Sequence, residues 1–162
     1  MRCSKRRLHP RLVALVFLGV MLMATSVFRG VFSGTRPGNL GLHDGKLAPC
    51  PNKPNCVNSE ATDPRHAIAP LAFTGNPDEA MQTLHAIVAG MERARLMTRE
   101  VDYLYVEITS KLLGFVDDVE FVLDRQAQRI RVRSASRLGY SDFGVNRKRI
   151  EAIRAVFDTH HP

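Results

Sequence analysis

The block of residues 114–154 carries the polar side chains that could do chemistry: carboxylates, guanidiniums, hydroxyls and a carboxamide close together in the chain. Several of them fall where the periodicity predicts a buried face, and burying such groups is costly unless they are paired. The block therefore indicates either a structural polar network or a ligand-binding site. The candidate residues are Asp117, Asp118, Arg133, Ser134, Ser136, Arg137, Asp142, Asn146 and Arg147.

Two strands predicted at 115–123 and 129–136 form a hairpin that sorts its charges between two faces. When apolar residues are matched with apolar residues, Asp118 and Glu120 fall on the same face as Arg131 and Arg133. Opposite charges across a hairpin stabilise it by about a few tenths of a kcal/mol per pair. We expect these four side chains to form exposed and therefore weak ion pairs.

The other face of the hairpin is apolar but also holds Asp117, Ser134 and Ser136. An unpaired carboxylate there would be neutralised or expelled, so Asp117 is expected to find Arg137, the serine hydroxyls or backbone amides. In the predicted last helix, Asn146 lies on the apolar stripe and points inward. The side chains expected to converge where the sheet end meets this helix are Asp117, Ser136, Arg137, Asp142, Asn146 and Arg147.

This corner has two interpretations. A helix N-terminus with guanidiniums nearby binds anions. Alternatively, the carboxylates already satisfy the arginines and lock the helix to the sheet, because buried ionic groups generally occur in pairs. The charge distribution favours the lock: residues 100–124 hold seven acids against Lys111, and residues 125–154 hold nine basic residues against Asp142 and Glu151.

No catalytic sequence motif occurs in the chain: there is no GxSxG, Walker loop, HExxH, GxGxxG or paired CxxC. No cofactor is indicated. Cys50, Cys56, His43 and His66 form a conceivable zinc set, but their spacing fits no usual ligand pattern. A disulfide between the two cysteines is the better interpretation for a domain exported from the reducing cytosol.

The elements that must position these residues follow the order β-α-β-β-β-β-α. An edge strand at 67–73, interrupted by Pro70, is followed by a helix that starts at Asn76-Pro77-Asp78-Glu79 and stops near Gly90. Strands at 95–99 and 103–109 precede the hairpin, and a helix at 143–157 follows it. The cysteine loop cannot be a helix and is not expected to be a central strand. This order predicts an α+β domain with a mainly antiparallel sheet of four to five strands and two helices on one face.

The N-terminal end carries a targeting signal. A basic flank at 1–11 precedes the uncharged run 12–28, which is at the lower limit for crossing a bilayer as a helix. We expect an anchor or signal segment over 12–32, a linker at 33–46 and an exported domain at 47–158. The basic flank keeps the N-terminus in the cytoplasm and places the domain in the periplasm or outside. Cleavage near Ser26, releasing a periplasmic or secreted domain, is the alternative.

Charge argues against a nucleic-acid partner. Residues 1–32 hold six basic side chains and no acid, which leaves 17 of the 23 basic residues against 16 acids elsewhere. A nucleic-acid-binding protein carries its positive charge on the folded domain instead.

The motif CPNKPNCVNS at 50–59, together with GFVDDVEF at 114–121 and RSASRLGYSDFGVNRKRIE at 133–151, resembles the domain of unknown function 1499 family. This family is found in bacterial envelopes and in plastids, and the resemblance covers roughly 47–156. The usual first motif has serine where Asn58 stands. The resemblance implies an envelope location, and it gives no catalytic residues to carry over.

Two functions remain for the domain. The first is a membrane-tethered, non-catalytic module, either a structural scaffold or one that binds a protein or an anionic small ligand near Arg137 and Arg147. The alternative is a hydrolase or transferase with Asp117 or Asp118 as general base and arginines that stabilise an anionic intermediate.

Overall fold

The structure is a computed structural model, and it describes residues 32–161. The anchor or signal segment and its cleavage site lie outside these residues, except for Phe32. Among the described residues, no helix is long and apolar enough to cross a membrane.

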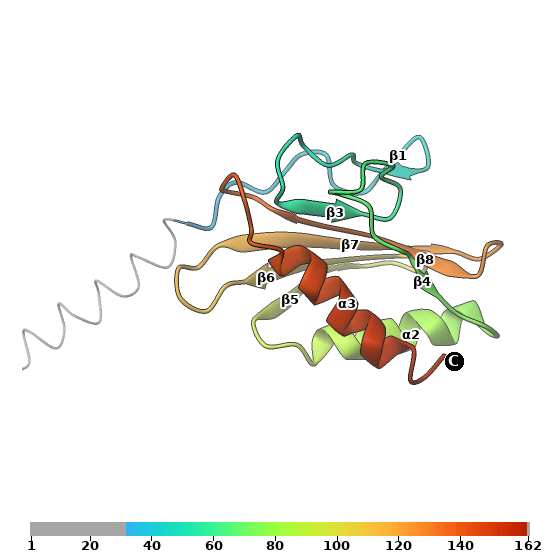
Figure 1. Cartoon of the computed structure of the whole chain (residues 1–162). Coiled ribbons are helices and arrows are strands. Elements are labelled where there is room, and N and C mark those ends of the chain that lie inside the picture. The colour runs from blue at the N-terminus through green and yellow to red at the C-terminus, as the bar shows by residue number, and fades with distance from the viewer. Residues whose placement is uncertain (1–31, 162) are drawn as a thin grey trace, which may run out of the picture.

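A six-stranded antiparallel sheet with two helices on one face forms the domain, so the predicted α+β class is confirmed (Figure 1). The path across the sheet is β3-β8-β7-β6-β5, and β4 pairs with β8 beside that path. A separate pair of short strands precedes the sheet. The strands are β1 (Leu42–His43), β2 (Lys46–Leu47), β3 (Cys56–Asn58), β4 (Leu71–Ala72), β5 (Ala94–Arg99), β6 (Tyr103–Thr109), β7 (Val116–Asp124) and β8 (Arg129–Ser136).

The two helices are α2 (Pro77–Ala89) and α3 (Val145–Phe157). The start of α2 is as predicted: the Asn76 side chain accepts a hydrogen bond from the Asp78 amide at 2.9 Å, and Pro77 occupies the first turn. Both helices pack against the same face of the sheet, which we call the helix face (Figure 1). The hydrophobic core fills the space between the helices and the sheet, and the sheet contributes alternate residues of β6, β7 and β8 to it.

The predicted hairpin register is confirmed. Asp117 pairs with Ser136, Val119 with Ser134, and Glu120 with Arg133 across β7 and β8. Alternate apolar residues of the two strands face the helices, because the pleat sends successive side chains to opposite faces. They are Val119, Phe121, Leu123, Ile130 and Val132.

The structure adds detail to three expectations about the rest of the chain. The cysteine motif is neither a helix nor a central strand, as expected, and it leads into the edge strand β3, since its prolines precede Cys56 and leave the next amides free to pair with β8. The strand expected at 67–73 shrinks to Leu71–Ala72 after Pro70, which has no amide hydrogen. Residues 33–46, expected to be a linker, contain β1 and reach across the sheet face opposite the helices, which we call the outer face (Figure 1).

Candidate functional site

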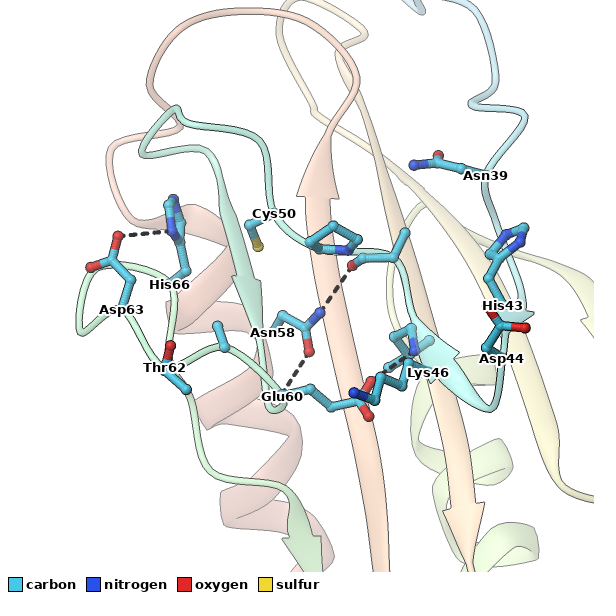
Figure 2. Close-up of a pocket in the computed structure, with 14 residues that line it drawn as sticks. Asn39, His43, Asp44, Lys46, Cys50, Asn58, Glu60, Thr62, Asp63 and His66 are labelled. Carbon is cyan, nitrogen blue, oxygen red and sulfur yellow. Dashed lines mark hydrogen bonds and ion pairs between the residues drawn. The ribbon is translucent and has the colours of Figure 1, made fainter.

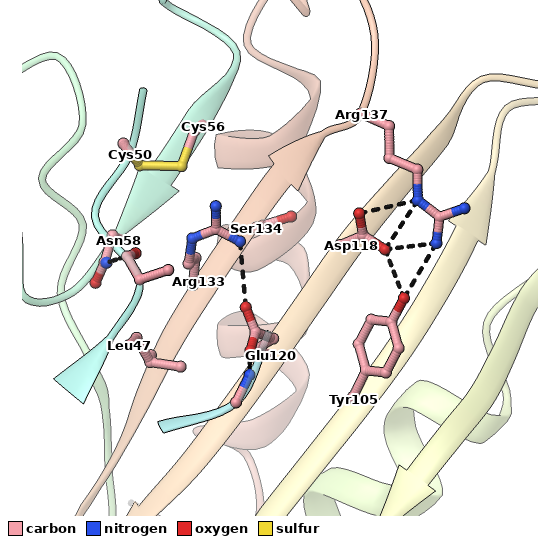
Figure 3. A network of polar contacts seen from close by, with 12 residues as sticks. Leu47, Cys50, Cys56, Asn58, Tyr105, Asp118, Glu120, Arg133, Ser134 and Arg137 are labelled. Atoms are coloured by element: carbon pink, nitrogen blue, oxygen red, sulfur yellow. Dashed lines mark hydrogen bonds and ion pairs between the residues drawn. A yellow bond between two sulfur atoms is a disulfide. The ribbon is translucent and has the colours of Figure 1, made fainter. Parts of the chain in front are cut away.

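Arg137 is the centre of a buried ion cluster on the outer face (Figure 3). Its guanidinium donates to both carboxylate oxygens of Asp118, at 2.7 to 3.1 Å, and also to Glu107. The Tyr105 hydroxyl donates to Asp118 at 2.6 Å and accepts from Arg137 at 3.1 Å. Arg36 reaches the same Glu107 carboxylate at 2.6 Å from the segment that precedes the sheet. Two cations and two anions are thus joined in one network.

The ionisation of this cluster follows from burial and pairing. Burial, with the hydrogen bond to Asp118, raises the pKa of the Tyr105 phenol above its ordinary value of 10. Burial alone would raise the pKa of Glu107, but hydrogen bonds from Arg137 and Arg36 outweigh it and hold that pKa below its ordinary value. The hydrogen bond to Asp118 raises the pKa of Arg137, although burial opposes it. Arg137 therefore stays a cation and Glu107 an anion at neutral pH.

A second ion pair lies next to the first on the outer face. Glu120 is fully buried and accepts from Arg133 at 3.2 Å, from the Tyr103 hydroxyl at 2.9 Å and from the Gly41 amide at 2.6 Å. We expected the charges of this face to be exposed and weakly paired, which was wrong. The segment that contains Gly41 covers them, and water is excluded.

The same segment is tied down at its far end. Glu60 accepts from the Leu47 amide at 2.7 Å and from Arg131 at 3.0 Å, and Arg131 also donates to the Gly45 carbonyl. The Asn58 side chain donates to the Ala48 carbonyl at 3.0 Å. Residues 33–48, which we call the entry segment, are thus held on the outer face from Arg36 to Ala48.

Asn146 is the centre of a separate polar cluster on the helix face. Its amide nitrogen donates to the Ser136 hydroxyl, the Asp142 carboxylate and the Asn55 carbonyl, at 2.9 to 3.1 Å, and its oxygen accepts from Ser134. Asp142 also accepts from the Asn146 backbone amide at 2.8 Å, so it caps the first turn of α3. The cluster fastens α3 to β8 and to the cysteine motif.

Arg149 completes this cluster and is the partner of Asp117. It donates to the Asp117 carboxylate, to Ser134 at 3.1 Å and to the Asn146 oxygen at 2.7 Å. We expected Arg137 to be a candidate partner for Asp117, but Arg137 lies on the opposite face of the sheet. Adjacent aspartates 117 and 118 therefore serve different networks.

The polar residues that the sequence singled out lie on two different faces of the sheet. Asp117, Ser134, Ser136, Asp142 and Asn146 come together on the helix face, and Asp118, Arg133 and Arg137 lie on the outer face. Arg147 joins neither cluster, because its guanidinium donates to the Arg65 carbonyl. Sequence reasoning missed several members of the two clusters: Arg36, Asn55, Tyr103, Tyr105, Glu107 and Arg149. Of these, Arg149 had a signal, since it lies three residues after Asn146 on the same helix side.

A disulfide joins Cys50 and Cys56, as predicted, with their Cα atoms 5.6 Å apart. It borders a cleft of about 890 Å³ between the entry segment and residues 58–66 (Figure 2). His43 and His66 both line this cleft, but His66 contacts Asp63 and the Lys53 carbonyl instead of facing His43. Within residues 32–161, no group of His, Cys, Asp and Glu side chains is placed to hold a metal ion.

A second concavity, the apolar groove, lies between residues 110–115 and 138–145 and has a volume of about 480 Å³. Its walls are mainly apolar, and they include Leu112, Leu138 and Phe143. Asp117 and Asp142 also line it, so the helix-face cluster borders this groove. The outer-face carboxylate Asp118, in contrast, is only 1% exposed.

The model of the family described as "Protein of unknown function (DUF1499)" matches residues 46–157 of this chain. The chain therefore belongs to that family. No curated protein matches it.

Proposed function

We propose that this member of the DUF1499 family is a membrane-tethered, non-catalytic module whose two polar clusters are structural. The observation that carries the proposal is the attachment of the entry segment. Arg36, Gly41 and Leu47 are each held by a carboxylate of the sheet domain, at 2.6 to 2.7 Å. A segment that only connected an anchor to a domain would not need to be held by carboxylates of that domain. The entry segment is therefore a fixed part of the domain.

The tether itself is inferred from the sequence. Five basic residues precede the uncharged run 12–28, which has the length and composition of a minimal membrane-spanning helix. The apolar run continues past the weak cleavage site at Ser26, which favours retention as an anchor. The domain is then periplasmic or external.

The non-catalytic part of the proposal is supported by the state of the carboxylates. Asp118 is paired with Arg137 and closed off by Tyr105, which leaves no room for a substrate. Glu120 is fully buried with Arg133. The guanidinium of Arg137 is occupied by two carboxylates, so it does not offer the free cation that an anionic ligand would require.

The test is to express the full chain and to locate it by membrane fractionation and alkaline carbonate extraction. We expect it to resist extraction and to retain an N-terminal peptide that includes residues 12–28 when its mass is measured. A variant that lacks residues 12–28 is the matched control and should be soluble. A mature soluble chain that begins at Val27 would contradict the tether.

The hydrolase or transferase remains a second candidate because Asp117 lines the apolar groove. In that case Asp117 would be the general base, and Arg149 would have to release it. Hydrolysis of apolar aryl esters that is lost in Asp117→Asn but kept in Asp118→Asn would favour this function. Equal inactivity of the parent chain and both variants would count against it.

A further inference from the structure

One end of the domain carries a set of exposed apolar side chains. They lie in two loops, the one between β6 and β7 and the one between β8 and α3, and at the first residue of α3 (Figure 1). Both Leu112 and Phe143 are 90% exposed, which is unusual for side chains of this size. The set, which we call the apolar end, consists of Leu112, Leu113, Leu138, Tyr140, Phe143 and Val145.

The backbone presents this end at a conformational cost. Phe143 has a φ of 54°, in the left-handed region that bulky side chains rarely adopt. Strained residues of this kind persist where the surrounding structure holds them and cluster at functional sites. Here the strain projects an aromatic ring into solvent instead of burying it. Apolar surface that is gathered and exposed in this way marks an interaction site.

The described chain begins beside the apolar end. The ring of Phe32 lies 5.2 Å from that of Phe115, and Phe115 lines the apolar groove. The entry segment is packed closely here: a Cβ atom at Gly34 would come within 3.0 Å of Leu138 and of Arg137. Phe32 and Gly34 are therefore held against the two loops that carry the exposed side chains.

The length of chain before Phe32 limits how far this end can be from a membrane. The apolar run ends at Phe28, so three residues lie between it and Phe32, and Phe32 is four residue steps further along the chain. Four residue steps span at most roughly 14 Å when fully extended. The headgroup region on each side of the hydrocarbon is itself about 5–8 Å thick. If residues 12–28 cross the bilayer, the apolar end must lie at or near its surface.

The charges at this end also fit a lipid surface. Lys111 lines the groove, and Lys148 is exposed in the first turn of α3, next to Val145. The two acids that border the groove already have partners, since Asp117 is paired with Arg149 and Asp142 caps α3. Apolar tips flanked by lysines are typical of surfaces that insert into the interface of a bilayer.

We propose that the apolar end docks into the lipid bilayer that holds residues 12–28, with Leu112 and Phe143 inserted at the level of the headgroups and upper acyl chains. This inference rests on the proposed tether and adds the orientation of the domain. The sheet then stands with the turn between β6 and β7 toward the membrane, and the turn between β5 and β6 points away from it.

The chain contains no tryptophan, so single tryptophans can report insertion without background. Phe143→Trp and Leu112→Trp are placed at the apolar end, and either can replace the other if one variant fails to fold. Val101→Trp is the matched control, because Val101 is 74% exposed and lies in the turn between β5 and β6, at the other end of the sheet. Each full-length variant is reconstituted into vesicles of phosphatidylcholine and phosphatidylglycerol, with ordinary or brominated acyl chains.

We expect Phe143→Trp and Leu112→Trp to emit at shorter wavelength and to lose roughly half of their fluorescence to brominated chains, as side chains at the acyl boundary do. Val101→Trp should show neither change.

Vesicle flotation distinguishes a failure of docking from a failure of the proposed tether. A chain that floats with the vesicles while Phe143→Trp and Leu112→Trp remain unquenched overturns docking and leaves the tether intact. A chain that does not float overturns both. A blue shift that depends on protein concentration and is insensitive to bromine would assign the apolar end to a second copy of the chain, and would also overturn docking.

Discussion

Replacing Arg137 with methionine tests whether the outer-face network is a structural lock. Methionine keeps much of the aliphatic stem but removes five hydrogen bonds to Asp118, Glu107 and Tyr105. Asp118 is 1% exposed, so it would stay buried without its cation. Removing one partner of a buried pair costs about 3–5 kcal/mol, since the remaining charge is left uncompensated. In a domain of this size, that loss lowers Tm by about 10–20 °C.

Arg125 offers a matched control. It also contacts two carboxylates, Asp78 and Asp102, each at 2.7 Å, but its side chain is 38% exposed. Exposed ion pairs contribute about 0–1 kcal/mol, so Arg125→Met should change Tm by only about 4 °C or less. Thermal unfolding of the full chain in detergent micelles, followed by circular dichroism at neutral pH, measures both variants. Equal losses for Arg137→Met and Arg125→Met would refute the reasoning.

The double variant Arg137→Met with Asp118→Asn tests whether these two side chains act as a pair. Asp118→Asn removes the negative charge that Arg137→Met leaves unpaired. The double variant should therefore lose clearly less stability than the sum of the two single losses, because residues in one network are coupled. Strict additivity would mean that the two side chains do not act as a pair.

Two further predictions follow from the disulfide and from the buried phenols. Replacing both Cys50 and Cys56 with serine should lower the free energy of unfolding by about 2 kcal/mol under oxidising conditions, since the closed loop is short. The parent chain in reductant should lose about as much stability. Denaturant titration measures both losses. Stability should also fall above about pH 10, because the pKa of Tyr105 and of Tyr103 is raised in the folded chain while the unfolded phenols ionise at about 10. Unfolding measured from pH 8 to 11 should show this slope, and Tyr105→Phe should reduce it; a slope unchanged in that variant would contradict the assignment.

The parts of the fold that could be predicted are those governed by local periodicity. The alternation of Val119, Phe121 and Leu123 against Ile130 and Val132 determined the register of the hairpin, and this register placed Asp117 and Asp118 on opposite faces. The start of α2 was equally local, because a capping side chain and a proline within the first turn act within a few residues.

The burial of the outer face could not be predicted in this way. Glu120 and Arg133 lie on a face that reads as polar, and polar faces of antiparallel sheets usually meet water. The cover is the entry segment, which has no apolar period and lies far away in the chain: Gly41 contacts Glu120 across 79 positions. The entry segment is held through backbone amides and carbonyls and through a single guanidinium, and such contacts leave no pattern in the sequence. The partner of Asp117 was also missed, because the sequence places two arginines, 137 and 149, near the point where the end of the sheet meets α3. Periodicity alone did not choose between them.

The attachment of the entry segment also determines the order in which the domain can be completed. Arg36 and Gly41 are synthesised long before their partners Glu107 and Glu120, which lie 71 and 79 residues later. The segment that emerges first therefore cannot be seated until β6 and β7, which carry these two partners, have been made. Before the entry segment is seated, the side chains of Asp118, Glu120 and Arg133 are exposed to water. Seating the segment must remove water from these charged groups. Contacts of such long range slow folding.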